Sequence, residues 1–247
     1  MRVNGITVES YGISDIGYVR KSNEDAWAAI PSCTFYVLAD GMGGHQAGEV
    51  ASEEAVQTLS KEIQKLSPKT SSSDAEISLK KMIEQVNQKI YHLSHKNPAY
   101  AGMGTTLACL WIYDEKLTLA HVGDSRIYRF RKKQLSQLTE DHSLRQELIS
   151  KGELDEESSR VFKNILTRAI GTQSQVVPSI KTYDLENEDI YFLCSDGLTD
   201  EITPEEMESI LLKSKTIKEA SDSLVGAAKA GGGSDNITIV MVKILKP

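Results

Sequence analysis

Two apolar runs of the chain end in the same dipeptide, Asp-Gly. They cover residues 34–41 and 189–197. Each pattern predicts a buried β-strand that ends in a carboxylate, followed by a glycine that permits a sharp turn. A buried strand has no structural need for a terminal Asp, so Asp40 and Asp196 indicate one site at which both negative charges bind the same partner. A hard divalent cation is the simplest such partner.

The remaining hydrophobic pattern changes between helix and strand periods. Apolar residues at helical spacing predict one helix from about Glu49, with its apolar face reaching Leu66. They predict a second helix, with apolar residues over 79–93 and an end near Asn97-Pro98, and the polar stretch 69–74 joins the two. Thr203 and Thr216 each open a capping-box sequence and predict two later helices. Further strands are predicted at residues 6–14, 105–113, 116–122, 125–131, 134–138, 179–184 and 237–244.

Strands that cluster between paired helices favour an α+β fold. No internal repeat and no boundary divides the sequence, so we predict a single domain over residues 1–247. Residues 139–164 differ from the rest because they are charged and weakly periodic. We interpret this segment as a mobile insert.

Composition narrows the classes of function. A net charge of −7 over 247 residues argues against a general nucleic-acid binder, because phosphate backbones require a basic face. No apolar run approaches the roughly 18 residues of a membrane span, and residues 1–5 have no apolar signal region. We therefore expect a cytoplasmic protein without a membrane partner. Of the three cysteines, Cys109 and Cys194 lie in apolar runs and are predicted to be inert core residues.

Acidic residues gather near the ends of the predicted strands. They are Glu24, Asp25, Asp40, Asp124, Asp196 and Asp235. For a single Asp-Gly, a turn is the simpler interpretation. Several acids that converge from buried strands would repel one another without a cation, and carboxylates suit Mg²⁺ or Mn²⁺. Arg20 precedes two of these acids and could grip a phosphate, although a salt-bridged loop explains it equally well.

Six short motifs follow one another along nearly the whole chain. They are Arg20-x-x-Asn23-Glu24-Asp25, Asp40-Gly41-Met42-Gly43-Gly44-His45, Gly102-Met103-Gly104-Thr105-Thr106, Val122-Gly123-Asp124-Ser125-Arg126, Ser195-Asp196-Gly197 and Ser234-Asp235-Asn236. None is specific alone, but together and in this order they resemble the signature series of the PPM/PP2C family of metal-dependent Ser/Thr protein phosphatases, in its compact bacterial form.

The resemblance implies a four-layer α/β/β/α sandwich, in which two antiparallel β-sheets pack face to face between pairs of antiparallel helices. It also implies a centre of two Mn²⁺ or Mg²⁺ ions at one end of the sandwich. Asp40 would bridge the metals, the Gly41 carbonyl would bind one, and Asp196 and Asp235 would hold the other. Gly197 would serve only as a turn.

Three further roles follow from the resemblance. Glu24 and Asp25 would act mostly through metal-bound waters. Asp124 would hold a third, weaker metal together with Asp196, and Arg20 would bind the phosphate. The segment 139–164 would be the family's variable flap beside the metals, and its middle lacks the usual His-Pro, which affects substrate preference.

The implied mechanism follows from charge. Two cations lower the pKa of a shared water, so that a metal-bridging hydroxide is available near neutral pH and attacks phosphorus in line. The metals and Arg20 neutralise the developing charge, and no protein nucleophile is needed. The chain is thus expected to hydrolyse phosphoserine and phosphothreonine in proteins, among them a Ser/Thr protein kinase that it would oppose in signalling.

This chain departs from the animal members of the family at the residue proposed as general acid, which would donate a proton to the leaving alkoxide. Those members often have a His two positions after the first Asp, where this chain has Met42. His45 could compensate, although a residue that shapes the helix start is the simpler interpretation. His121 is interpreted as core packing or as support for the metal site, and Arg126 and Arg168 as structural pairs.

Two alternatives stay open beside the phosphoprotein phosphatase. One is a catalytically silent member that acts as a regulatory module, against which the intact acids argue. The other is a hydrolase of another small phosphate ester, such as a nucleotide. The sequence has no motif for dimerisation, so we expect a monomer. The basic run 129–133 is interpreted as a solvated hairpin and not as a nucleic-acid patch.

Overall fold

The computed structural model of the protein describes residues 2–3, 6–43, 47–66, 72–155, 158–162 and 165–246. Two six-stranded sheets form its centre. In one sheet the strands follow the order β1 (Arg2–Val3), β2 (Ile6–Asp15), β12 (Ile237–Leu245), β11 (Ile190–Cys194), β8 (Arg126–Arg131) and β9 (Gln134–Gln137). All of these pairings are antiparallel.

The second sheet is also antiparallel. Its order is β10 (Ser179–Asp184), β7 (Lys116–Val122), β6 (Leu107–Tyr113), β4 (Phe35–Met42) and β3 (Asp25–Ile30), and the short β5 (Gly104–Thr105) pairs with β4. The hairpins β6–β7 and β8–β9 turn at Asp114-Glu115 and Lys132-Lys133. All four of these turn residues have positive φ, as two-residue hairpin loops of the common twist require.

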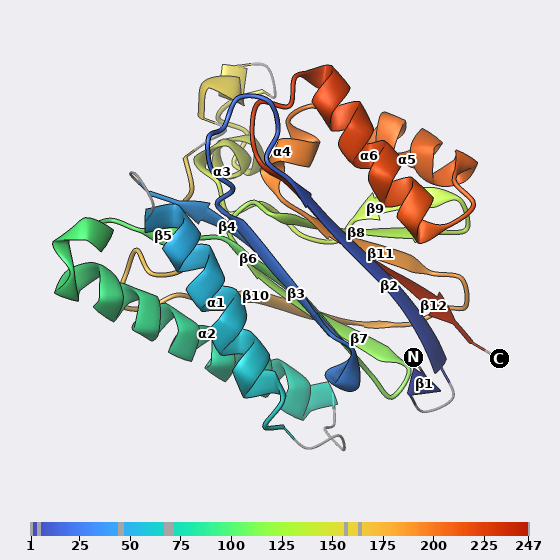
Figure 1. The fold of residues 1–247 in the computed structure, drawn as a ribbon, viewed down its shortest axis with the longest axis horizontal. Coiled ribbons are helices and arrows are strands. Elements are labelled where there is room, and N and C mark those ends of the chain that lie inside the picture. The colour runs from blue at the N-terminus through green and yellow to red at the C-terminus, as the bar shows by residue number, and fades with distance from the viewer. Residues whose placement is uncertain are drawn as a thin grey trace.

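Helices cover the outer face of each sheet, as Figure 1 shows. α1 (Ala47–Ile63) and α2 (Ser72–Lys96) pack on the β4 sheet, where Val37, Leu59 and Ile83 are buried together. On the other sheet, α5 (Pro204–Lys213) and α6 (Ile217–Gly231) pack over Phe192. The next residue of β11, Leu193, points to the core between the sheets, as the period of two in a strand requires. The predicted four-layer sandwich is confirmed.

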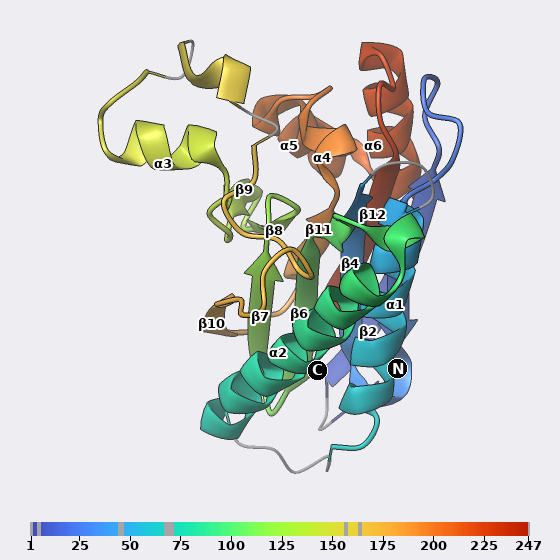
Figure 2. The same cartoon turned by 90° about the vertical axis from the view of Figure 1, so that its left-hand side faces the viewer.

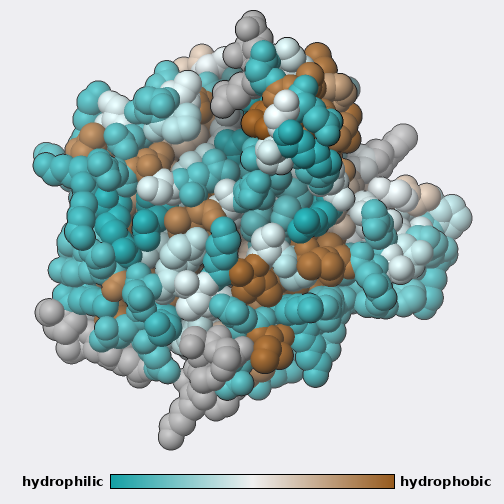
Figure 3. Space-filling view, turned by 180° about the vertical axis from the view of Figure 1, so that it is seen from behind, coloured by the Kyte–Doolittle hydropathy of each residue, from teal (hydrophilic) through white to brown (hydrophobic). Residues whose placement is uncertain are grey.

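The segment after β9 lies outside these layers. It includes α3 (Leu144–Ser150), which Ser143 caps, and the 3₁₀ turn η3 (Ser158–Phe162). Figure 2 shows both projecting from one end of the sandwich. Short 3₁₀ turns also follow β3 (η1, Pro31–Cys33) and α2 (η2, Pro98–Tyr100). None of the described helices is both long and apolar enough to cross a membrane. The face in Figure 3 is mostly hydrophilic, with small separate hydrophobic groups.

Some local predictions need correction. At α5 both halves of the capping box are present, but at α6 the Glu219 carboxylate accepts from the Lys215 N–H instead of the Thr216 N–H. The predicted turns at the two Asp-Gly pairs are wrong. β4 continues through Gly41, and Gly197 belongs to the helix α4 (Asp196–Thr199).

Both glycines serve close packing. A Cβ atom on Gly41 would lie 2.1 Å from the Gly48 carbonyl oxygen, and one on Gly197 would lie 2.2 Å from the Asn236 carbonyl oxygen. Each of these distances is far inside van der Waals contact. The absence of a side chain therefore lets β4 meet α1, and lets α4 meet the start of β12.

Candidate metal centre

The predicted acidic residues come from segments that meet at one end of the sandwich. β4, β7 and β11 end there, and β3 and β12 begin there. Figure 1 shows the loop after β2, together with α3 and α4, at this end, away from the two termini. Antiparallel pairing explains the meeting, since the end of one strand lies beside the start of its neighbour.

Asp25 and Asp40 lie directly opposite each other in the pairing of β3 with β4. Side chains at directly opposed positions are close neighbours, and like charges there destabilise a sheet. Burial raises the pKa of Asp25 to about 7, with further contributions from the negative charges of Asp196 and Asp235. The pKa of Asp40 is well above its ordinary range, because of burial and the charge of Asp25.

Three more acids act on this pair. Asp124 follows β7, Asp196 is the first residue of α4, and Asp235 precedes β12. Burial, and then the charge of Asp196, raise the pKa of Asp124 to about 7. The charges of Asp124, Asp196 and Asp235 all raise the pKa of Asp40. The five aspartates therefore form one electrostatically linked group.

Glu24 lies in a close contact between β3, β4 and α1. Its carbonyl oxygen accepts from the Gly41 N–H at 3.0 Å and from the Ser52 hydroxyl at 2.5 Å. Its own N–H donates to Asn236 Oδ1 at 2.8 Å. A Cβ on Gly48 would lie 2.1 Å from Glu24 Oε2, so the carboxylate needs a glycine beside it. Burial is the main cause that raises the pKa of Glu24.

Arg20 is the one predicted cation of the site. Its Nη2 donates to Asp235 Oδ2 at 2.6 Å, and its side chain is 51% exposed. This hydrogen bond raises the pKa of Arg20. The guanidinium therefore lies beside the acids and faces solvent, where an incoming anion can reach it. His45, the candidate general acid, lies outside the described residues.

Hydroxyl groups around Asp25 are functional candidates that the sequence analysis missed. Ser195 Oγ and Thr238 Oγ1 donate to Asp25 Oδ2 at 2.8 and 2.6 Å. Asp25 Oδ1 is buried and has no hydrogen-bond partner. Their one sequence signal is a hydroxyl next to the acidic motif within an otherwise apolar run, as in Leu193–Asp196 and Asp235–Val240.

These residues fit a divalent cation. Among the described residues, no three Asp, Glu, His or Cys side chains converge as a complete metal cage. Hard cations, however, also take backbone carbonyls and waters as ligands. The donors here are oxygens only, one buried carboxylate oxygen is unpaired, and the aspartates repel one another. A cation at this group would relieve that repulsion and take up the unpaired oxygen.

A pair of stacked imidazoles supports the loop that contains Asp124. The rings of His121 and His142 lie 4.5 Å apart, and His121 Nε2 bonds to the Glu140 carbonyl at 2.9 Å. The Gly123 N–H donates to His142 Nδ1 at 3.2 Å. The interpretation of His121 as packing or support therefore fits its contacts.

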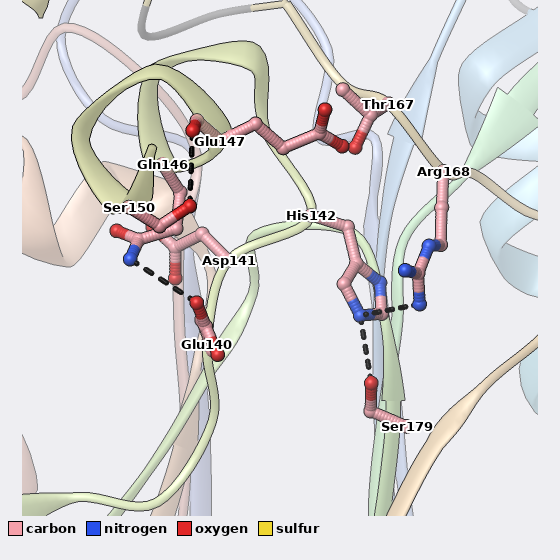
Figure 4. Close-up of a pocket in the computed structure, with 9 residues that line it drawn as sticks. All are labelled: Glu140, Asp141, His142, Gln146, Glu147, Ser150, Thr167, Arg168 and Ser179. Atoms are coloured by element: carbon pink, nitrogen blue, oxygen red, sulfur yellow. Dashed lines mark hydrogen bonds between the residues drawn. The ribbon is translucent and has the colours of Figure 1, made fainter. Parts of the chain in front are cut away.

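His142 also lines a cavity of about 160 Å³ at the base of α3, shown in Figure 4. His142 Nε2 bonds to Ser179 Oγ at 2.9 Å, and Arg168 Nη1 lies 3.3 Å from the same nitrogen. Burial, His121 and Arg168 lower the pKa of His142 to about 3. This histidine is therefore a neutral structural group.

The other basic residues are mainly in structural pairs. Arg126 Nη2 donates to Asp141 at 2.7 Å. Arg131, in the run 129–133, donates to Asp189 and Glu186, so this part of the hairpin is engaged within the fold. Cys109 and Cys194 are fully buried, and burial raises the pKa of each thiol to about 12. They are core residues, as predicted.

Comparison with known proteins identifies the family. The model of the family "Protein phosphatase 2C" matches residues 18–225. The chain therefore belongs to the protein phosphatase 2C family, and the resemblance seen in its motifs is confirmed.

Particular relatives are similar over nearly their whole length. The serine/threonine phosphatase stp of Listeria monocytogenes serotype 4b (strain F2365) is 38% identical over 235 residues, 93% of each chain. Protein phosphatase PhpP of Streptococcus pneumoniae serotype 2 (strain D39) is 38% identical over 237 residues, 94% of this chain and 96% of PhpP.

Solved structures agree with these relatives. The S. agalactiae serine/threonine phosphatase superposes with a TM-score of 0.90 at 35% identity, covering 98% of this chain and 100% of the other. The catalytic domain of the serine/threonine protein phosphatase PstP, in complex with two manganese ions, superposes with a TM-score of 0.87 at 32% identity and the same coverage.

Proposed function

We propose that this protein is a metal-dependent protein serine/threonine phosphatase that hydrolyses phosphoserine and phosphothreonine and opposes a Ser/Thr protein kinase. One observation gives the proposal its strongest support. Asp25 and Asp40 are opposed across a strand pair, and the acids around them raise their pKa values further. Such a group is costly for a fold to keep unless it binds cations.

The residues have distinct proposed roles. Asp40 and the Gly41 carbonyl, with Asp196 and Asp235, hold two Mn²⁺ or Mg²⁺ ions, and Glu24 and Asp25 bind their waters. Asp124 with Asp196 holds a third, weaker ion. When bound, the cations supply Lewis acidity toward water and the phosphoryl group.

Arg20 orients the substrate. Its exposed guanidinium is held by Asp235 beside the acids, where it can donate to phosphoryl oxygens. In this way Arg20 would position phosphorus against the metal centre and stabilise the charge that develops on the oxygens. We keep His45 as the candidate proton donor to the leaving alkoxide.

Release of phosphate from p-nitrophenyl phosphate tests the enzyme assignment. The wild-type protein should release phosphate with Mn²⁺, lose activity on chelation and regain it when Mn²⁺ returns. A wild-type protein that is folded and inactive with Mn²⁺ would instead be a silent regulatory module. The intact acidic group argues against that alternative.

The substrate class needs a separate comparison. We expect faster turnover of a phosphothreonine peptide than of a nucleotide at equal concentration. The reverse order would support the small phosphate ester instead. The proposal further includes a cytoplasmic monomer in one domain with a flap at 139–164, without nucleic-acid or membrane partners. Light scattering of the purified protein, and its distribution between cytosol and membranes, would check those expectations.

A further inference from the structure

A line of polar side chains runs under the acidic group, from the loop after β2 to Asp25. Asn23 Nδ2 donates to Ser14 Oγ at 2.8 Å. Ser14 Oγ lies 2.7 Å from Thr238 Oγ1, which in turn donates to Asp25 Oδ2 at 2.6 Å. Asn23 Oδ1 accepts from the Asp25 N–H at 3.1 Å. The line of hydrogen bonds therefore reaches Asp25 at two points, the side-chain carboxylate and the backbone N–H.

Donor chemistry fixes the direction of these hydrogen bonds. The Thr238 hydroxyl donates its single proton to Asp25 Oδ2, so this proton is not available for Ser14. Ser14 must then use its own proton on Thr238, and it accepts from the Asn23 amide. Every donor points toward the carboxylate, and hydrogen bonds aligned in series strengthen one another.

The two oxygens of Asp25 are therefore unequal. Oδ2 receives the Thr238 and Ser195 hydroxyls, whereas Oδ1 is buried without a partner. Thr238 and Ser195 are themselves fully buried. The two hydrogen bonds to Oδ2 fix the orientation of the carboxylate plane. They leave Oδ1 available to accept a cation or a water within the acidic group.

We propose that Thr238, supported by Ser14 and Asn23, is a positioning residue that fixes the orientation of the Asp25 carboxylate and aims Oδ1 at the divalent cation or its water. This inference rests on the proposed function, since it concerns affinity for the same cations. It assigns a part in metal binding to three uncharged residues: Ser14 on β2, Thr238 on β12 and Asn23 in the loop before β3. Residues that orient metal ligands typically affect metal affinity by 10–100-fold.

Thr238→Val tests the inference, because valine keeps the shape and removes the hydroxyl. We expect Mn²⁺ to bind about tenfold more weakly by isothermal titration calorimetry. Thr238→Ser should bind within about twofold of the wild type, since it keeps the donor. With p-nitrophenyl phosphate, the Mn²⁺ concentration for half-maximal activity should rise in the Val variant, and kcat at saturating Mn²⁺ should fall little.

Thr118→Val is the matched control. Thr118 is also a fully buried strand threonine, and its hydroxyl bonds to Thr182 and Tyr113, away from the acids. We expect the Thr118 variant to lose stability without a change in Mn²⁺ affinity. If Thr238→Val does not fold, Ser14→Ala removes the next member of the line and should weaken Mn²⁺ binding by a smaller factor.

The outcomes separate this inference from the proposed function. Unchanged Mn²⁺ affinity in a folded Thr238→Val protein would overturn the inference and leave the phosphatase assignment intact. Equal losses in the Val and Ser variants would also overturn it, because packing would then be the cause. A folded wild type that binds no Mn²⁺ would overturn the proposed function itself.

Discussion

An aspartate flanks each end of β11, and the surroundings of the two aspartates are opposite in kind. Asp189, just before the strand, is fully buried. Arg131 donates to both of its oxygens at 2.7 and 2.6 Å, and Tyr191 and the Glu186 N–H donate as well. The charge of Asp196, just after the strand, raises the pKa values of Asp25, Asp40 and Asp124.

The difference distinguishes a structural acid from a functional one. At Asp189 the fold itself supplies the positive charge, from Arg131, and the hydrogen-bond donors to the carboxylate. At the other end, Arg20 is half-exposed and pairs with Asp235. In the described part of the chain, no basic side chain forms an ion pair with Asp25 or Asp40, and burial and neighbouring negative charges raise the pKa of both. A charge that the fold leaves uncompensated indicates a partner from outside.

A pair of substitutions, one at each kind of acid, gives the strongest test of this distinction. Asp40→Asn should lower Mn²⁺-dependent phosphate release more than about 100-fold, because it removes a metal ligand, and it should not destabilise the metal-free protein. Asp189→Asn should cost about 3 kcal/mol of stability, because it leaves Arg131 without its carboxylate. Phosphatase assays and urea unfolding would measure the two effects. Equal effects of both variants on activity per folded molecule would contradict the distinction.

Close backbone packing at the acidic end predicts the next effect. Gly197→Ala should lower the free energy of unfolding by about 2 kcal/mol, since its Cβ would lie 2.2 Å from the Asn236 oxygen. The control is Gly226→Ala in α6, where a Cβ meets open space, and it should stabilise by about 0.5–1 kcal/mol. Thermal unfolding of both variants checks the prediction, which fails if Gly197→Ala is as stable as the wild type.

The pH dependence of stability should be smaller in size but specific to the acidic end. Asp25 and Asp124 have pKa values of about 7 in the folded protein, against 3.8 without the fold, so the folded state keeps more protons between these values. Stability of the metal-free protein should therefore fall as pH rises through this window.

Added Mn²⁺ should raise Tm more at pH 7.5 than at pH 5.5, because the cation binds the ionised carboxylates. Asp124→Asn should flatten the dependence in the metal-free protein. Differential scanning calorimetry with and without Mn²⁺ would measure both. A metal-free protein that gains stability from pH 5.5 to 7.5 would contradict the raised pKa values.

Thiol alkylation should have the smallest effect. Cys194 lies two residues before Asp196, but burial raises the pKa of its thiol to about 12 and protects it from reagents. Iodoacetamide under native conditions should leave phosphatase activity unchanged, whereas chelation removes it. Complete loss on alkylation of exposed thiols would count against a mechanism that needs no cysteine.

Local patterns in the sequence predicted much of the fold. The apolar runs that end at Asp40 and Asp196 are strands, and the periodic segments are helices. β3 was missed because its sequence, Asp-Ala-Trp-Ala-Ala-Ile, is short and rich in alanine. Its pairing with β4, which opposes Asp25 and Asp40, is a long-range register that local periodicity does not determine.

The site was predicted less evenly. The acidic positions were found, because carboxylates at the ends of apolar runs are unusual. The metal roles of Glu24, Asp124 and the others stay predictions. The two glycines were taken as turn formers, because a glycine needed for close approach cannot be told from one needed for φ until the neighbouring segment is known. Ser14 and Thr238 come together only through the pairing of β2 with β12.

The position of β12 has a consequence for synthesis. β12 is hydrogen-bonded to both β2 and β11, and the segment from Asp235 to Thr238 holds Arg20, Glu24 and Asp25. While this segment has not yet emerged from the ribosome, the nascent chain has no complete acidic centre, however much of the β4 sheet has folded. Translation therefore delays the chemistry until almost the whole described chain is available, and premature termination leaves a fragment without it.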